Sequence, residues 1–282
     1  MIVEKILNNN VVVSIDPKTN KEVILMGSGL AFKRKVGQEI EDDKIEKIFI
    51  VDDKKMGNKI KRLINEIPDG VFELVNDIIA HSEKNLNREL DKQIYISLSD
   101  HIGFAIKRYK NNVEIKNDLI DEIRRIHKDE YRMAIWALNY INESLNINLP
   151  EDEAGFIALH IVNASYKETA KESIISTNIV KGILNIIRYY YSVEFNEDEL
   201  NYDRLLTHLK YFAKRVVTNK QNKDESTEFL QLAANSHPEA YDCASKVKLY
   251  VEKNYSYPVN EDEIIYLTMH IHRVISVIRA EE

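Results

Sequence analysis

Four of the eight histidines form two pairs at matching positions in the second part of the chain. His101 and His208 are the first members of the pairs, and His160 and His270 are the second. Near neutral pH much of the imidazole is unprotonated, so a histidine can accept a phosphoryl group and later release it. Half-buried core histidines are the alternative, but a core has no need of imidazole at two matching pairs of sites. The repetition favours phosphate acceptance.

A metal site is the second chemistry that these histidines allow. His270 and His272 form a His-x-His pair, but the first pair has Val162 at the position of His272. The chain contains neither a His-Asp dipeptide nor a His-Glu-x-x-His sequence, so a helical metal-dependent hydrolase is the less favoured alternative. We expect no catalytic residue, no metal and no cofactor, and we do not expect an enzyme.

An internal duplication of one helical domain places the histidines. Residues 95–108, which contain His101, align with residues 202–215, which contain His208. Residues 151–161 align with residues 261–271, and both segments begin with Glu-Asp-Glu ahead of the second histidine. Acidic residues suit a helix N-terminus electrostatically. The polar stretch 166–173 is the expected boundary between the two copies.

The first 55 residues follow a different pattern. Short β-branched runs at Val11–Ile15, Val23–Leu25 and Ile45–Val51 predict strands, and groups rich in Asn, Pro and Gly between them predict turns. A domain of this length buries a limited core, so dimerisation through the sheet is a reasonable way to stabilise it. After Met56 the apolar residues recur at helical spacing, as in the run that includes Ile60 and Leu63.

The chain therefore predicts a multidomain protein with a small antiparallel β domain followed by two homologous all-α helical bundles. Its 282 residues, 44% apolar with 8 Gly and 5 Pro, suit two or three folded, helix-rich domains. The expected boundaries are residues 1–55 for the β domain, 64–169 for the first helical copy and 173–282 for the second.

Charge separates these segments. The net charge of -7 argues against a protein that grips nucleic acid over its whole surface. Residues 1–60 carry 11 basic and 10 acidic side chains, whereas the rest of the chain carries 28 and 36, so only the first segment is a candidate for binding RNA or DNA. The single cysteine, Cys243, is expected to be a small core residue. No apolar run is long enough to span a membrane, so we expect a cytoplasmic protein.

Two segments of the β domain resemble the RNA-binding domain of the BglG/SacY/LicT-type transcriptional antiterminators. They are Lys5-Ile-Leu-Asn-Asn-Asn-Val-Val12 and Met26-Gly-Ser-Gly-Leu-Ala-Phe32. The two helical copies are similar to the regulatory domains of the same proteins, known as PRD1 and PRD2. The resemblance covers the full chain in the same domain order and includes all four histidines.

In that family the β domain forms a symmetric dimer, which clamps a hairpin in the leader of a nascent messenger RNA and prevents a terminator hairpin from forming. Asn side chains can bind base edges and 2′-hydroxyls, glycines allow close approach, and an aromatic ring can stack on a base. The family commonly has a basic residue where this chain has Ser28, although basic side chains at 33–35 supply charge nearby. By motif, the expected RNA contacts are Lys5, Asn8, Asn10, Gly27, Ser28, Gly29 and Phe32.

The resemblance also implies how the histidines are used. The phosphocarrier protein HPr phosphorylates the second regulatory domain and activates the protein, whereas phosphorylation linked to the sugar permease acts on the first and inhibits it. His208 and His270 are then the activating pair, and His101 and His160 the inhibitory pair. Asp100 is a candidate to orient His101. The runner-up is a phosphorylation-controlled DNA-binding activator with the same regulatory domains, which needs a helix-turn-helix segment where this chain predicts strands.

Overall fold

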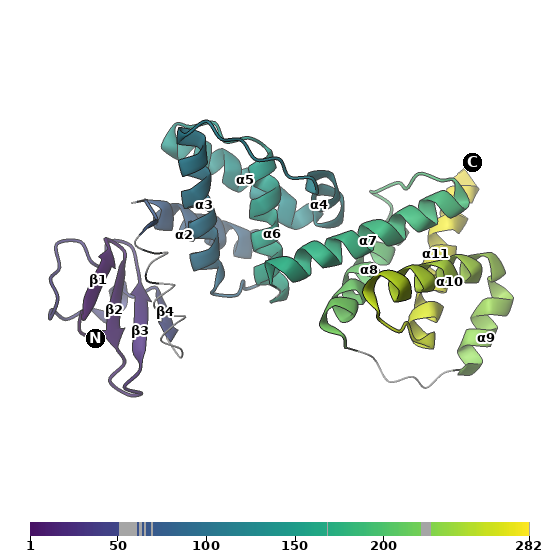
Figure 1. Cartoon of the computed structure of the whole chain (residues 1–282), viewed down its shortest axis with the longest axis horizontal. Coiled ribbons are helices and arrows are strands. Elements are labelled where there is room, and N and C mark those ends of the chain that lie inside the picture. Colours follow the sequence, from purple (N-terminus) through teal and green to yellow (C-terminus); the bar gives the residue numbers. More distant parts are fainter. Residues whose placement is uncertain are drawn as a thin grey trace. The chain divides into compact units, whose positions relative to one another are not determined.

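The computed structural model of the chain describes residues 1–50, 61, 64, 66–68, 70–167, 169–220 and 227–281 (Figure 1). In these residues an antiparallel sheet precedes a series of α-helices, as the sequence predicted. The helical spacing expected directly after Met56, with Ile60 and Leu63, lies outside the described residues, as does Val51 at the end of the last expected strand. None of the described helices is long and apolar enough to cross a membrane.

Four short strands form the sheet: β1 Lys5–Asn8, β2 Val11–Ile15, β3 Glu22–Met26 and β4 Lys47–Ile50. Each strand pairs with the next one along the chain, so that Val12 lies opposite Leu25 and Leu25 lies opposite Ile48. β2, β3 and β4 fall on the β-branched runs, because such side chains pack well on a pleated surface. The core is small, as its length requires, and it includes Leu30 and Ile40 from the segment between β3 and β4.

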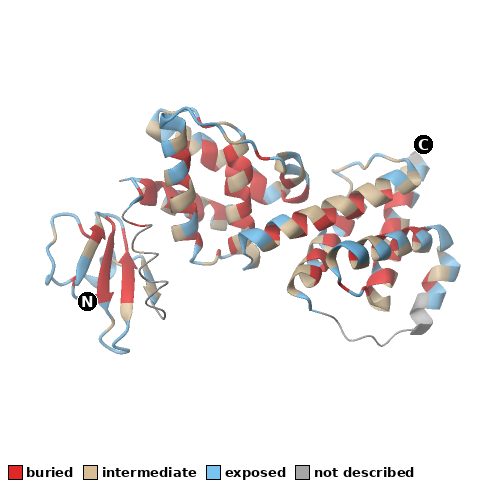
Figure 2. Ribbon diagram, viewed as in Figure 1, coloured by how far each residue is buried: buried red, intermediate tan, exposed pale blue. Residues whose placement is uncertain are grey.

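Among the described residues of the first helical copy, the helices are α2 Val71–Leu86, α3 Ile94–Lys110, α4 Ile120–Ile126, α5 Lys128–Leu145 and α6 Asp152–Tyr166. The inward faces of α3 and α6 are buried, and Figure 2 shows buried residues along the helices. Leu98, Ile102 and Ala105 form the apolar stripe that the sequence predicted around His101. α6 begins directly after Pro150 and Glu151, with acidic residues in its first turn.

The second copy repeats this order with α7 Ala170–Tyr191, α8 Leu200–Thr218, α9 Thr227–Ser236, α10 Pro238–Tyr255 and α11 Glu261–Glu281. α7 begins at a capping box, in which the Thr169 hydroxyl accepts from the Glu172 backbone and the Glu172 carboxylate accepts from the Thr169 backbone. Leu205, Leu209 and Phe212 of α8 are fully buried. Thus α8 presents the same apolar stripe around His208 as α3 presents around His101.

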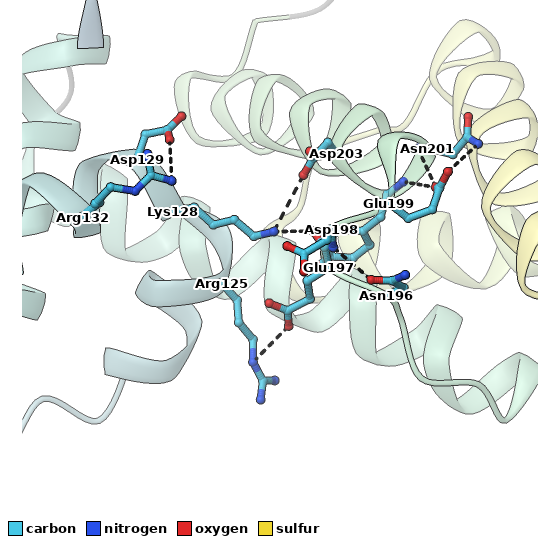
Figure 3. A network of polar contacts seen from close by, with 11 residues as sticks. Arg125, Lys128, Asp129, Arg132, Asn196, Glu197, Asp198, Glu199, Asn201 and Asp203 are labelled. Atoms are coloured by element: carbon cyan, nitrogen blue, oxygen red, sulfur yellow. Dashed lines mark hydrogen bonds and ion pairs between the residues drawn. The ribbon is translucent and has the colours of Figure 1, made fainter. Parts of the chain in front are cut away.

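The chain divides into two compact units that do not follow the duplication completely. One unit holds Met1–Asp118 and Asp129–Lys167, and the other holds Leu119–Lys128 and Glu168–Glu282. The short helix α4 therefore belongs to the second unit, although it lies between α3 and α5 in the sequence. There Arg125 Nε lies 3.4 Å from a Glu197 carboxylate oxygen, and Lys128 Nζ lies 3.9 Å from Asp203 (Figure 3). These ion pairs join α4 and Lys128, the first residue of α5, to the segment around the start of α8.

Candidate functional site

In the first copy, α3 and α6 bring His101 and His160 together. Their ring centroids are 5.1 Å apart, with the planes inclined by 42°. The apolar stripe of α3 lies beneath His101, which keeps the side chain only 15% exposed. Phe156, one turn before His160 on α6, packs at 5.7 Å from the His101 ring. The two predicted histidines of this copy therefore share one small site.

The second copy forms the same arrangement from α8 and α11. The ring centroids of His208 and His270 are also 5.1 Å apart, with the planes inclined by 26°. Tyr266 takes the place of Phe156 and packs at 5.5 Å from His208. The repeat of the pair, down to the neighbouring aromatic ring, shows that the duplication preserved a local arrangement of side chains as well as the order of helices.

A buried glutamate completes the first site, and the sequence analysis did not identify it. The Glu153 carboxylate receives a 2.7 Å hydrogen bond from Arg108, and its other oxygen lies 3.0 Å from His101 Nε2. Burial by itself would raise the pKa of Glu153, but the contacts with His101 and Arg108 outweigh it, so that the pKa is lowered. The carboxylate beside His101 Nε2 is therefore that of Glu153. The role of Asp100, the sequence candidate for orienting His101, stays a prediction.

Glu263 is the equivalent residue of the second site. Arg215 donates two hydrogen bonds to it, at 2.6 and 2.8 Å, and His208 Nε2 lies 3.7 Å from one of its oxygens. In sequence, both glutamates are the third residue of a Glu-Asp-Glu helix start, where acidic residues are ordinarily solvated. The sequence signal that distinguishes Glu153 and Glu263 from solvated acidic residues is that three residue types, His, Arg and Glu, occur at matching positions in both copies.

Burial lowers the pKa of three of these histidines, which favours their neutral form. It lowers the pKa of His160 to about 3, with the neighbouring His101 adding to the effect. It also lowers the pKa of His208 to about 3, with help from His270 and Arg215. The pKa of His270 is lowered by burial and then by Arg273 and Arg204. A neutral imidazole retains one nitrogen lone pair, which a nucleophile needs.

The other candidates for chemistry have ordinary surroundings. His272 stacks on His237 at 3.7 Å rather than joining His270, and no group of three or more potential metal ligands occurs in the part of the chain that the structure describes. Cys243 is fully buried, and burial raises the pKa of its thiol to about 12. This agrees with the expectation that Cys243 is a core residue.

The residues expected to contact RNA cluster where the turn between β1 and β2 meets the segment after β3. The Asn10 side-chain oxygen accepts a 2.7 Å hydrogen bond from the Gly29 backbone, and the Gly27 backbone donates to the Asn10 carbonyl at 3.0 Å. A Cβ at Gly27 would lie 2.1 Å from the Lys44 carbonyl oxygen, and Gly29 has φ of +61°. The close approach of the Lys44 carbonyl therefore requires glycine at position 27, and the positive φ favours glycine at position 29.

The side chains of this cluster differ in exposure. Lys5 is exposed, and Phe32 is 60% exposed with the Lys33 ammonium 5.2 Å from its ring centroid, so Phe32 is not a core residue. Arg34 instead pairs with Glu41 at 2.7 Å. The backbone of Ser28 donates to Glu46 at 3.0 Å.

Two of the asparagines contact residues outside the β domain. The Asn10 amide donates a 2.5 Å hydrogen bond to Glu73 of α2, and the Asn8 amide donates to the Ile64 carbonyl at 3.4 Å. Asn10 is consequently buried. Of the expected contacts, Lys5 and Phe32 are thus open to a ligand, whereas the Asn10 amide is engaged by the carboxylate of Glu73.

Comparison with known proteins adds findings of three kinds: family models, relatives and a solved structure. The family model named CAT RNA binding domain matches residues 1–58, and the PRD domain matches residues 76–164 and 181–274. The chain is 40% identical to transcription antiterminator LicT of Bacillus subtilis (strain 168) over 275 residues, which are 98% of this chain and 99% of that protein. It is 36% identical to the beta-glucoside operon antiterminator of Dickeya chrysanthemi over 281 residues, covering 100% of this chain and 99% of that protein. The crystal structure of GlcT CAT-PRDI is similar with a TM-score of 0.51 and 38% identity, covering 58% of this chain and 97% of that one.

Proposed function

This chain belongs to the BglG/LicT-type family of transcription antiterminators, and we propose that it binds a hairpin in a messenger RNA leader and is switched by histidine phosphorylation. The observation that carries the proposal is the repeated cluster of two histidines, one glutamate and one arginine, present in both helical copies behind a single β domain. A bound leader hairpin then prevents the competing terminator hairpin from forming.

RNA binding is assigned to the β domain. Phe32 offers a ring for stacking on an unpaired base, Lys5 offers positive charge, and the tight backbone at Gly27 and Gly29 allows close approach. Ser28 supplies no charge, so the cations nearby, Lys33 above all, take the phosphate contacts. The proposed contact set is Lys5, Asn8, Asn10, Gly27, Ser28, Gly29 and Phe32.

Phosphorylation is assigned to the histidine pairs. We assign His208 and His270 to phosphorylation by HPr, which activates, and His101 and His160 to phosphorylation linked to a sugar permease, which inhibits. A phosphoryl group adds about -1.5 to -2 charges, and at sites as buried as these it must change the local packing. Arg215 already holds Glu263, so a phosphate on the second copy has to compete for this cation.

The remaining assignments follow from this function. The protein acts in the cytoplasm as a homodimer, has no catalytic activity of its own, and divides into residues 1–55, 64–169 and 173–282. The alternative, a DNA-binding activator, needs a helix-turn-helix. The described residues 1–50 form a β sheet instead, and they contain no such motif.

The RNA-binding assignment is tested by gel shift of the full chain with a leader hairpin. Phe32→Ala should weaken binding about tenfold or more, because stacking on an aromatic ring contributes roughly 1–3 kcal/mol per base. Its urea midpoint should not change, since Phe32 is 60% exposed. Phe104→Ala, an exposed phenylalanine of the first helical copy, is the matched control. Equal RNA affinity in the two variants, or RNA binding confined to residues 61–282, would contradict the assignment.

The switch is tested by incubation with phosphoenolpyruvate, enzyme I and HPr. Acid-labile, base-stable label should appear on the full chain and should be lost when His208 and His270 are both replaced by Ala. Label that persists in this double variant would exclude the second pair as the HPr-dependent site.

A further inference from the structure

We propose that Glu153 and Glu263 fix the tautomer of the first histidine in each copy, so that the phosphoryl group is accepted at Nδ1 of His101 and His208 and not at Nε2. This inference rests on the proposed function and specifies the atom that carries the modification. The glutamates act here as positioning residues, because they contact the histidine and not the phosphoryl donor.

The first copy gives the clearest geometry. His101 Nε2 and the Glu153 oxygen 3.0 Å away are both buried, and neither makes a hydrogen bond of good geometry within the described residues, so each is the closest polar group available to the other. A carboxylate only accepts, so the proton of a neutral His101 ring is held on Nε2. The hydrogen bond from Arg108 at 2.7 Å keeps the carboxylate ionised. The lone pair available to a donor is then the one on Nδ1.

The second copy reaches the same tautomer with a looser contact. Both oxygens of Glu263 are held by Arg215, and the buried His208 Nε2 lies 3.7 Å from one of them, beyond a normal hydrogen bond. Placing the Nε2 lone pair against a carboxylate would be repulsive. The proton is therefore again assigned to Nε2.

This arrangement supports transfer from a phosphorylated imidazole of a carrier protein. The Nδ1 lone pair attacks phosphorus and forms the new N–P bond, while the N–P bond of the donor breaks and its electron pair stays on the donor nitrogen. The acceptor ring keeps its Nε2 proton and becomes cationic. Glu153 or Glu263 stabilises that cation at the moment it forms, which is the role of an oriented carboxylate beside a nucleophilic histidine.

The second histidine of the first copy shows that the assignment is specific. His160 places Nδ1, not Nε2, 3.3 Å from a side-chain oxygen, that of Ser97 on α3. A contact with the glutamate through Nε2 is thus a property of the α3 and α8 positions. In this copy the Glu153 carboxylate of α6 lies beside His101 Nε2, and the Ser97 hydroxyl of α3 lies beside His160 Nδ1.

The test uses two full-length variants, one keeping only His101 of the four histidines and one keeping only His208, the others being replaced by Ala. Each is labelled with phosphoenolpyruvate, enzyme I and HPr, with the sugar permease added for the variant that keeps His101, and the phosphohistidine isomer is identified after alkaline hydrolysis. Nδ1-phosphohistidine in every variant that takes label supports the proposal. Nε2-phosphohistidine in either one overturns it and leaves the proposed function intact. Label on the wild type but on neither variant also overturns it, and no label on the wild type overturns the proposed function as well.

The positioning role has a separate readout. Glu263→Gln in the variant that keeps only His208 should slow labelling about tenfold or more, in line with the loss of an orienting partner, and should yield a mixture of the two isomers. Glu263→Asp should restore a single isomer. Glu261→Gln removes a charge from the same helix start and is the matched control. A single Nδ1 isomer in Glu263→Gln would show that Glu263 does not select the nitrogen.

Discussion

The two histidine sites have the same residue types but distribute their charges differently. In the first copy Glu153 divides its oxygens between Arg108 and His101, whereas in the second copy both oxygens of Glu263 are taken by Arg215. The surroundings of the second histidine differ further, because Arg204 and Arg273 lower the pKa of His270. The comparison teaches that a duplicated site can keep its geometry while its electrostatic field changes.

The positions equivalent to these two arginines carry no charge in the first copy. Arg204 aligns with Ser97, and Arg273 aligns with Asn163. A phosphate at His270 would therefore meet two cations that a phosphate at His160 lacks. This difference gives a physical basis for opposite effects of the same modification in the two copies.

The largest effect should come from removing the buried carboxylates. Glu153→Ala and Glu263→Ala should each lower the free energy of unfolding by roughly 3–5 kcal/mol, because an arginine is left without its partner in a buried site. Glu263→Ala should cost more, since it abolishes two hydrogen bonds from Arg215 rather than one from Arg108. Urea unfolding followed by far-ultraviolet circular dichroism measures both. Losses no greater than that of Glu261→Ala would show that the clusters do not stabilise their bundles.

A smaller effect is expected from exchanging the charges between the copies. Arg204→Ser combined with Arg273→Asn makes the second site resemble the first and should lower steady-state phosphorylation of His270 about tenfold, the equivalent of roughly 1.4 kcal/mol. The measurement is the label on a chain whose other three paired histidines are Ala. The reverse exchange, Ser97→Arg with Asn163→Arg, should raise the label on His160. If neither exchange changes the label, the arginines do not distinguish the sites.

The last effect is a dependence of stability on pH. The folded-state pKa values of His160 and His208 are about 3, below the ordinary value of 6.5, so the unfolded chain binds more protons between these values. The contribution of each histidine to the free energy of unfolding is thus fully present above pH 6.5. It is lost as the pH falls toward 3, by about 1.4 kcal/mol per pH unit for each histidine. His160→Gln and His208→Gln should each reduce this slope in urea unfolding by a similar amount. If one of the two variants keeps the wild-type slope, the histidine replaced in that variant does not contribute to the pH dependence.

The sequence predicted the paired histidines because duplication makes a functional pair visible as a repeat at fixed offsets. It also predicted the fold class and strands β2, β3 and β4, because β-branched runs and helical spacing are local signals. It did not identify Glu153 and Glu263, whose burial depends on how α6 packs on α3 and α11 on α8. From sequence alone, a Glu-Asp-Glu helix start is expected to be three solvated charges. Only tertiary packing shows that the third residue is buried.

The RNA-binding cluster stays a prediction in its details. The sequence could not distinguish a core phenylalanine from an exposed one at position 32, and the structure shows the ring exposed. Nor could it foresee that Glu73 contacts Asn10, because the two residues are 63 positions apart. Contacts between distant segments follow from packing, and no local pattern carries them.

The short helix α4 has a practical consequence for anyone who cuts this chain into pieces. Ile123 and Ile126 are buried, and Ile126 lies in the same core as residues of α7, α8 and α11. The polypeptide enters the second compact unit at Leu119, leaves it at Lys128 and returns at Glu168. A single protease cut after Lys167 would therefore leave the two products held by a docked helix. A recombinant fragment that ends at Lys167 would expose the apolar face of α4 and would be prone to self-association. A fragment that begins at Glu168 would lack α4, which supplies part of its core.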